Sequence, residues 1–281
     1  MKVAVLPNLD KYGSDAVVEK LGNILKRNGI EAYLPDNISG ADFKHAPEEK
    51  LYKIADIIIT IGGDGTIIRY AKLAALENKP VIGINAGRMG YLANIEQNEL
   101  DLLSKLAANE FFVERRMMLS VSVVENGENI GKYIALNDAV ITCGFISRII
   151  DISVSVAGDS ISYRADGLII STPTGSTAYS MSAGGPIIDP LTQNICITPI
   201  CSHSLLAKPI LLGANNTLKL KAFTKKKADI YLTVDGRKVY SIKPYTEIYI
   251  KKSQKFAQLV RLNDRSFYKT LSAKFRDGRS I

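Results

Sequence analysis

The sequence predicts an α/β N-terminal domain with a parallel sheet, followed by a mostly β C-terminal domain. In the first part of the chain, apolar β-branched runs alternate with segments whose apolar residues recur at helical spacing. This alternation is typical of parallel strands joined by right-handed crossovers. After Arg115-Arg116, short alternating runs are separated by turn signals, which include Asn126-Gly127 and Asp235-Gly236 and favour antiparallel strands. We therefore place a domain boundary near Arg116.

The N-terminal elements follow one another in a regular order. Residues 3–6 have the pattern of a buried strand, and a helix capped by Ser14 and Asp15 ends at Asn28-Gly29. The further elements expected are a strand over 30–34, a helix opening at 47–49, a strand over 57–61, a helix from Thr66 and a strand over 81–84. This order predicts a Rossmann-like sheet, and ligands bind such sheets beyond the carboxyl ends of the strands.

Composition narrows the class of protein. The 281 residues, 46 % of them hydrophobic, are enough for one large or two ordinary cores. The net charge of +8 suits binding of polyanions, but scattered basic residues, 7 % aromatic residues and the lack of zinc spacing argue against nucleic acid. Three cysteines without a Cys-x-x-Cys pair fit a reducing compartment. The apolar N-terminal run breaks at Pro7, so we expect a cytoplasmic protein that does not bind membranes.

A glycine-rich turn with a single carboxylate follows the strand expected before Thr66. Gly62, Gly63 and Gly65 lack a Cβ and can take positive φ, so a bulky anion can approach the backbone N–H groups. The following helix adds the positive end of its dipole. Asp64 would repel phosphate unless it holds a bridging metal ion or takes a proton from an attacking hydroxyl, and both roles point to phosphoryl transfer. A turn with an aspartate N-cap explains this short motif equally well.

A second segment, residues 166–190, concentrates hydroxyl groups and glycines after a short apolar run. Hydroxyls at this density can satisfy the donors and acceptors of a nucleotide's sugars and phosphates, while glycine lets the backbone come close. The alternative is a solvated linker, but a linker lacks a preceding strand and does not usually hold Tyr179 and Met181. The segment therefore indicates a nucleotide site.

With the Gly62-Gly63-Asp64-Gly65-Thr66 motif, Asn137-Asp138 and residues 166–190 together, the chain closely resembles the NAD kinases over nearly its whole length. The first motif is shared with diacylglycerol, sphingosine and phosphofructo kinases, whereas Thr-Pro-Thr-Gly-Ser-Thr-Ala-Tyr-Ser is far more specific. The resemblance implies a phosphotransferase that moves the terminal phosphoryl group of ATP or polyphosphate to the 2′-hydroxyl of the adenosine ribose of NAD, giving NADP.

The resemblance also implies a division of the chain. Residues 1–116 would form the phosphate- and nucleotide-binding domain, and residues 251–281 would pack back on it. Residues 117–250 would form a β-sandwich-like domain that binds NAD. The family forms dimers and tetramers, so a homodimer or homotetramer is expected.

Three residues of the first domain receive roles. Asp64 matches the family's proton acceptor, a role worth roughly 10²- to 10⁴-fold in rate, whereas the residues alone leave general base and Mg²⁺ ligand equally open. Arg69, one helical turn further, could reach phosphate, and an exposed helix arginine is as good an explanation. Tyr91 would close the adenine side. The metal ligands stay unknown, and Mg²⁺ would be held through the phosphates of ATP.

The remaining roles fall in the second domain. Asn137 and Asp138 suit the cis-diol of a ribose, although such a pair alone is usually a turn and the family often carries Asn-Glu here. Asp166, with Arg164, would face the nicotinamide half, the alternative being a surface ion pair. Arg148 loosely matches a phosphate or ribose contact from a neighbouring subunit. The positions that would line the dinucleotide, with Tyr179 against adenine, are Thr177, Ala178, Tyr179, Ser180, Met181 and Ser182.

Two other functions are open. A lipid kinase of the diacylglycerol type shares the first glycine motif, but its acceptor calls for an apolar groove rather than a hydroxyl-rich loop. A dinucleotide sensor without chemistry would keep Asn137, Asp166 and Tyr179 but could lose Asp64. Because Asp64 is present, we favour the enzyme.

Overall fold

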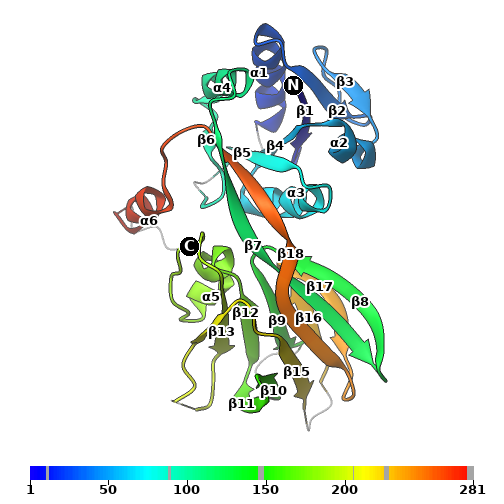
Figure 1. Cartoon of the computed structure of the whole chain (residues 1–281), viewed down its shortest axis with the longest axis vertical. Helices are drawn as coiled ribbons and strands as arrows, with labels where there is room; N and C mark the ends of the chain where they lie inside the picture. The colour runs from blue at the N-terminus through cyan, green and yellow to red at the C-terminus, as the bar shows by residue number, and fades with distance from the viewer. Residues whose placement is uncertain (11–12, 88–89, 145–148, 205, 225–227, 277–281) are drawn as a thin grey trace. The chain divides into compact units, whose positions relative to one another are not determined.

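The computed structural model describes residues 1–10, 13–87, 90–144, 149–204, 206–224 and 228–276 (Figure 1). The chain divides into two compact units, one formed by Met1–Arg115 with Lys255–Ile281 and the other by Arg116–Gln254. Strands β7 (Phe112–Glu125) and β18 (Glu247–Arg261) each continue from one unit into the other. The chain therefore leaves the first unit along β7 and returns to it along β18.

The first unit is built on a parallel sheet with the strand order β18-β5-β4-β1-β2-β3, in which β6 also pairs with β5. Its strands are β1 (Lys2–Pro7), β2 (Glu31–Pro35), β3 (Lys44–Ala46), β4 (Ile57–Gly62), β5 (Pro80–Asn85) and β6 (Ile95–Glu96). Its helices are α1 (Ser14–Arg27), α2 (Glu48–Ile54), α3 (Asp64–Leu76), the 3-10 turn η1 (Leu100–Leu103), α4 (Ser104–Ala107) and α6 (Phe267–Arg276).

Burial explains why these segments form a parallel sheet. Every residue of β4 is buried, as are five of the six residues of β5, and continuous apolar runs of this kind belong in sheets covered on both faces. Helix α1 packs on the sheet with Val17, Leu21 and Leu25, which recur at helical spacing and are buried. The helix expected from Thr66 begins two residues earlier, at Asp64, so the carboxylate lies in the first turn of α3.

The second unit consists of antiparallel strands. One set has the order β11-β10-β15-β18, β7 pairs with β8 and β18, and a six-stranded sheet has the order β14-β13-β12-β9-β16-β17. The strands are β8 (Glu128–Ala135), β9 (Asp138–Cys143), β10 (Ile150–Val156), β11 (Asp159–Ala165), β12 (Gly167–Ser171), β13 (Asn194–Ile200), β14 (Ile210–Gly213), β15 (Leu218–Phe223), β16 (Ile230–Val234) and β17 (Arg237–Ile242). One core joins the inner faces, with Val121 and Leu220 from the first set and Ile141 and Leu168 from the second.

Three hairpins of this unit turn where the sequence predicted. Asp235 and Gly236 have φ of 47° and 74° and connect β16 to β17. Asn126-Gly127 and Ala157-Gly158 also have positive φ at both positions. Two consecutive positive φ angles match the right-handed twist of the flanking strands. The predicted fold class, a parallel α/β part followed by a mostly antiparallel β part, is confirmed.

None of the described helices is long and apolar enough to span a membrane.

Gly167 opens the central strand β12 at a point where the backbone of β9 leaves no room for a side chain, since a Cβ would lie 2.5 Å from the carbonyl oxygen of Ile141. We expect Gly167→Ala to lower the free energy of unfolding by about 1 to 3 kcal/mol because overpacking must be relieved by backbone shifts. Urea titration measures this. Gly213→Ala in β14 is the control, because its Cβ would meet no atom closer than 3.8 Å. Equal destabilisation of both variants would contradict the steric explanation.

Candidate functional site

Two loops of the first unit start side by side at the carboxyl edge of the sheet. Gly62 at the end of β4 and Asn85 at the end of β5 are register partners, and the amide of Ala86 donates to the Gly62 carbonyl at 3.3 Å. The loop after β4 leads directly into α3, and the loop after β5 runs through Tyr91 to Leu92. Ligands of parallel α/β sheets bind at this edge, so the predicted glycine motif lies where a ligand is expected.

The three glycines of the motif serve different purposes. A Cβ at Gly62 would lie 2.5 Å from Oγ1 of Thr66, so the protein's own packing requires glycine there. A Cβ at Gly63 or Gly65 would meet no described atom within 4 Å. Only Gly62 of the three has a positive φ, so the other two do not use that conformational freedom. Their contribution is open space beside the first N–H groups of α3, which suits the close approach of an anion.

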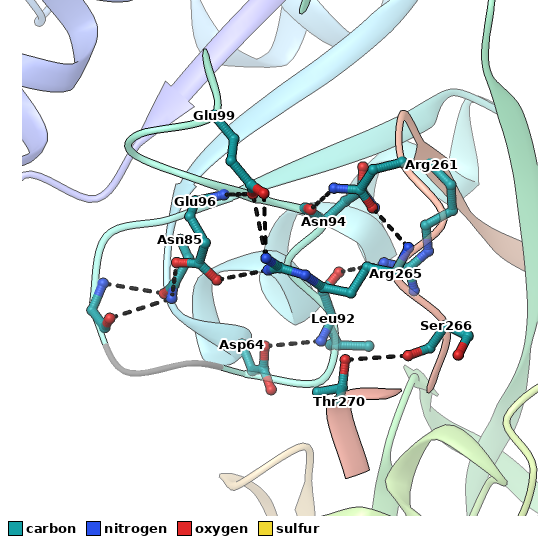
Figure 2. Close-up of polar contacts among 12 residues, drawn as sticks. Asp64, Asn85, Leu92, Asn94, Glu96, Glu99, Arg261, Arg265, Ser266 and Thr270 are labelled. Atoms are coloured by element: carbon teal, nitrogen blue, oxygen red, sulfur yellow. Dashed lines mark hydrogen bonds and ion pairs between the residues drawn. The ribbon is translucent and has the colours of Figure 1, made fainter. Parts of the chain in front are cut away.

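The Asp64 carboxylate is held by the neighbouring loop (Figure 2). Its Oδ2 accepts a hydrogen bond from the Tyr91 amide at 2.8 Å, and its Oδ1 accepts one from the Leu92 amide at 3.1 Å. Gly90 makes this approach possible, because a Cβ there would lie 2.0 Å from Oδ1. The N-cap of α3 is Gly63, without a side-chain cap, so the alternative of Asp64 as an N-cap is wrong. Charge-assisted bonds of this kind fix the orientation of the carboxylate and leave lone pairs for a further partner.

Tyr91 and Arg69 lie in different surroundings. The Tyr91 ring centroid is 6.0 Å from that of Phe267, and the Lys274 ammonium lies 4.5 Å from it, so α6 contacts this residue. Burial raises the pKa of the Tyr91 hydroxyl above its ordinary value, and the charge of Asp64 raises it further. Arg69 is exposed, with its guanidinium 5.1 Å from the ring of Tyr70 on its own helix. That placement matches the alternative of an exposed helix arginine.

In the second unit, a carboxylate that we did not single out as functional braces the Asn137-Asp138 pair. Asp235 accepts the backbone amide of Leu136 at 3.0 Å, that of Asn137 at 2.7 Å and that of Asp138 at 3.1 Å. The sequence marked Asp235 as a turn residue, which it is, but its side chain also fixes the start of β9. The Thr172 amide donates to the Asn137 carbonyl at 2.8 Å, so the Asn137 backbone is held from both sides.

The Asn137 backbone is hydrogen-bonded, but in the part of the chain that the structure describes the carbonyl oxygen of its side chain is not. Its Oδ1 is buried and has no hydrogen-bond partner among the described residues. A buried acceptor without a partner is costly, and such atoms in native proteins usually have an explanation such as a missing water or ligand. Asp138, next to it, is also buried. Within the described ranges, Asn137 Oδ1 is thus an unused acceptor next to Asp138, and the cis-diol role of the pair stays a prediction.

The hydroxyl-rich segment after β12 folds into the 3-10 turn η2 (Thr174–Thr177) and the short helix α5 (Tyr179–Ser182). The hydroxyls of Ser176, Thr177 and Ser180 bind the segment's own backbone or its neighbours, whereas Thr174 Oγ1 is buried without a described partner. Ser176 Oγ donates to the Pro173 carbonyl at 2.7 Å, and Ser180 Oγ lies 2.9 Å from Thr198 Oγ1. Thr177 and Ser180 are buried, Ala178 and Met181 are partly exposed, and Tyr179 and Ser182 are exposed. The hydroxyl density therefore shapes this loop more than it presents hydroxyls to a ligand.

The structure brings several predicted residues of this unit together. Burial raises the pKa of the Tyr179 hydroxyl, and the neighbouring Cys201, Asp138 and Asp166 raise it further. Arg164 is exposed on β11 and forms no ion pair with Asp166, so the alternative of a surface ion pair between these two described residues is wrong. Cys201 was not predicted as a site residue. Arg148 lies outside the described residues.

The carboxyl edge of the parallel sheet carries a glycine loop, a fixed carboxylate and a helix N-terminus. These features are typical of a phosphotransferase that binds a nucleotide. Comparison with known proteins gives the particular family. Residues 4–111 match the ATP-NAD kinase N-terminal domain, and residues 136–262 match the ATP-NAD kinase C-terminal domain. The chain belongs to the ATP-NAD kinase family, which confirms the resemblance inferred from its motifs.

Individual relatives agree with this assignment. The chain is 38 % identical to an NAD kinase of Thermoanaerobacter sp., over 98 % of this chain and 99 % of the relative. It is 41 % identical to an NAD kinase of Carboxydothermus hydrogenoformans, over 82 % of each. An NAD kinase from Archaeoglobus fulgidus, solved in complex with ATP, superposes with a TM-score of 0.76 at 28 % identity and covers 98 % of this chain and 99 % of its own. Yeast NADH kinase complexed with NADH superposes with a TM-score of 0.86 at 23 % identity over 100 % and 89 %, which shows the shared fold.

The bracing role of Asp235 can be tested by stability. Asp235→Asn keeps a residue that tolerates the positive φ of the turn but replaces one acceptor oxygen by a donor and removes the charge. We expect it to lower the free energy of unfolding by about 1 to 2 kcal/mol, because an amide at the start of β9 loses its partner. Asp159→Asn, at an exposed position of β11, is the matched control and should change stability by less than about 0.5 kcal/mol. Equal free energies of unfolding for the two variants, measured by urea titration, would contradict the bracing role.

Proposed function

We propose that this chain transfers the terminal phosphoryl group of ATP to the 2′-hydroxyl of the adenosine ribose of NAD, giving NADP and ADP. The observation that carries the proposal is the Asp64 carboxylate, held by two backbone amides beside the open first turn of α3. The family assignment supports the substrate class, and the ATP bound to the Archaeoglobus fulgidus relative supports the donor.

The proposed step divides the work between backbone and side chain. The N–H groups of Gly63, Asp64 and Gly65 and the positive end of α3 would bind the phosphates of ATP. Asp64 would accept the proton of the 2′-hydroxyl as its oxygen attacks the terminal phosphorus. A bond forms between that oxygen and phosphorus, and the bond to the bridging oxygen of ADP breaks. The two loop amides keep the carboxylate aimed during this step.

Mg²⁺ is part of the proposal. Within the described ranges, no three His, Cys, Asp or Glu side chains gather as metal ligands. Mg²⁺ in phosphoryl-transfer sites is commonly held by one or two carboxylates and the substrate phosphates, so Asp64 together with ATP fits this ion. Bound there, Mg²⁺ would neutralise negative charge on the phosphates.

The second unit would bind the acceptor. The free Asn137 Oδ1 and the Asp138 carboxylate would accept hydrogen bonds from the ribose diol. The exposed Tyr179 ring would stack on adenine, and Asp166 with Arg164 would face the nicotinamide half. The other proposed contacts are Thr177, Ala178, Ser180, Met181 and Ser182, with Arg148 reaching a neighbouring subunit. Residues 1–116 with 251–281 would thus be the phosphate-binding domain and residues 117–250 the NAD-binding domain.

We further propose a homodimer or homotetramer in the cytoplasm. Cys143, Cys196 and Cys201 are all free, as is usual for proteins of reducing compartments.

One assay tests the function. The purified chain with Mg²⁺ is given ATP or polyphosphate as donor and NAD, NADH or diacylglycerol as acceptor, and phosphorylated products are measured. NADP formed from NAD and ATP supports the proposal. Phosphorylation of diacylglycerol but not NAD would favour the lipid kinase, and binding of NAD without any product would favour the sensor.

Replacement of the proposed base should act on the rate. We expect Asp64→Asn to lower kcat for NADP formation by roughly 10²- to 10⁴-fold, because the amide cannot accept the proton. Binding of NAD, measured by calorimetry, should persist. Asp101→Asn, an exposed aspartate of the same unit, is the control and should leave kcat unchanged. A turnover of Asp64→Asn equal to that of the unchanged protein would remove Asp64 from the mechanism.

Replacement of Asp166 should instead act on acceptor binding. We expect Asp166→Ala to raise KM for NAD by roughly 10-fold or more with a smaller change in kcat, since a hydrogen bond to a charged group is lost. Steady-state kinetics with varied NAD measures both constants, with Asp159→Ala as the exposed control on β11. If both constants of Asp166→Ala are normal, its placement against the nicotinamide is wrong.

A further inference from the structure

The loop that holds Asp64 is itself held by the C-terminal segment of the chain (Figure 2). Arg265 bridges two carboxylates: its Nη1 lies 3.0 Å from Glu96 Oε1, and its Nη2 lies 3.4 Å from Glu99 Oε1. These three side chains are about a quarter to a third exposed. A guanidinium is suited to this arrangement because its fork of donors can serve two acceptors at once.

Glu96 links Arg265 to the start of the loop. Its second oxygen, Oε2, accepts a hydrogen bond from Asn85 Nδ2 at 2.8 Å. Asn85 is almost fully buried, and its Oδ1 accepts the Gly87 amide at 3.1 Å. Arg265 is therefore linked through two side chains to the point where the loop leaves β5.

The same segment also contacts the far end of the loop. Arg261 Nη1 donates to the Leu92 carbonyl at 3.4 Å, and the amide of the next residue, Leu262, donates to Asn94 Oδ1 at 2.8 Å. Phe267 and Lys274 approach the ring of Tyr91. Tyr91 and Leu92 are the residues whose amides bind Asp64.

We propose that Arg265 is a positioning residue for phosphoryl transfer. By holding Glu96, it holds Asn85 and the loop whose Tyr91 and Leu92 amides orient the Asp64 carboxylate. The inference rests on the proposed function, because it assigns Arg265 an effect on the step in which Asp64 takes part. Polar networks of this kind fix the geometry of a group that acts on substrate without touching the substrate themselves.

The first test is kinetic. Arg265→Ala should lower kcat for NADP formation by about 10- to 10²-fold, since small misplacements of a reacting group have effects of this size. KM for NAD should change by less than about threefold, because the acceptor contacts are untouched. Arg265→Lys keeps the charge but cannot bridge both carboxylates. Its kcat should therefore lie between that of the unchanged protein and that of Arg265→Ala. The double variant Arg265→Ala/Glu96→Gln should be no worse than Arg265→Ala, because both changes break one network.

The second test needs no substrate. Hydrogen exchange measured by mass spectrometry should be faster in the peptide over residues 85–92 of Arg265→Ala, while the urea midpoint shows that the chain is folded. If Arg265→Ala does not fold, Arg265→Lys is read in the same two assays. Lys26→Ala, which breaks an exposed ion pair with Asp42 in the same unit, is the control and should change neither readout.

The outcomes separate the inference from the proposed function. Normal kcat with normal exchange over 85–92 in the Arg265 variants overturns the positioning role, whatever the reaction is. A fall in kcat matched by an equal rise in KM for NAD, with unchanged exchange, also overturns it. If the unchanged protein does not phosphorylate NAD, the proposed function fails, and the exchange experiment still decides whether Arg265 fixes the loop.

Discussion

The arrangement of the candidate site in the first unit depends on one contact, the Asp64 carboxylate bound by the amides of Tyr91 and Leu92. This contact joins two loops that leave neighbouring parallel strands, and it requires a glycine at position 90, where a Cβ would overlap the carboxylate. The two amides donate charge-assisted hydrogen bonds, which stabilise the ionised carboxylate and fix its orientation. Backbone amides do so without adding a side chain to the space that a nucleotide needs.

The second unit uses the same kind of contact for another purpose. Asp235 accepts three backbone amides and thereby fixes Asn137, whose own Oδ1 is left without a partner. An ionised carboxylate has about four lone-pair sites. Asp235 accepts three hydrogen bonds from the backbone, whereas Asp64 accepts two. Asp235 therefore acts as a brace, and Asp64 keeps the capacity to accept a further proton or ion.

The sequence predicts features that depend on residues close together in the chain, and it does not predict contacts between distant residues. The parallel strands and the Asp235-Gly236 turn were predicted because apolar periodicity and turn chemistry are local. The hydroxyls after β12 were recognised, but not that Ser176 and Ser180 face inward, because their partners, the Ile188 carbonyl and Thr198 Oγ1, lie 12 and 18 residues away in the sequence. The contact between Arg265 and Glu96 spans 169 residues and leaves no local pattern. The site roles that we assign from the family remain predictions.

Two arginines of the C-terminal segment have different roles. Arg261 is 6 % exposed and pairs with Glu114 at 3.0 Å, so removal of Glu114 takes the carboxylate partner from a buried charge, which destabilises a fold strongly. Arg265 and its two carboxylates are partly hydrated, and pairs of that kind add little to overall stability. Arg261 thus anchors the segment on the sheet, whereas Arg265 acts mainly on the loop next to it. Because the weaker contact is the one linked to Asn85, the orientation of Asp64 can change while the unit stays folded.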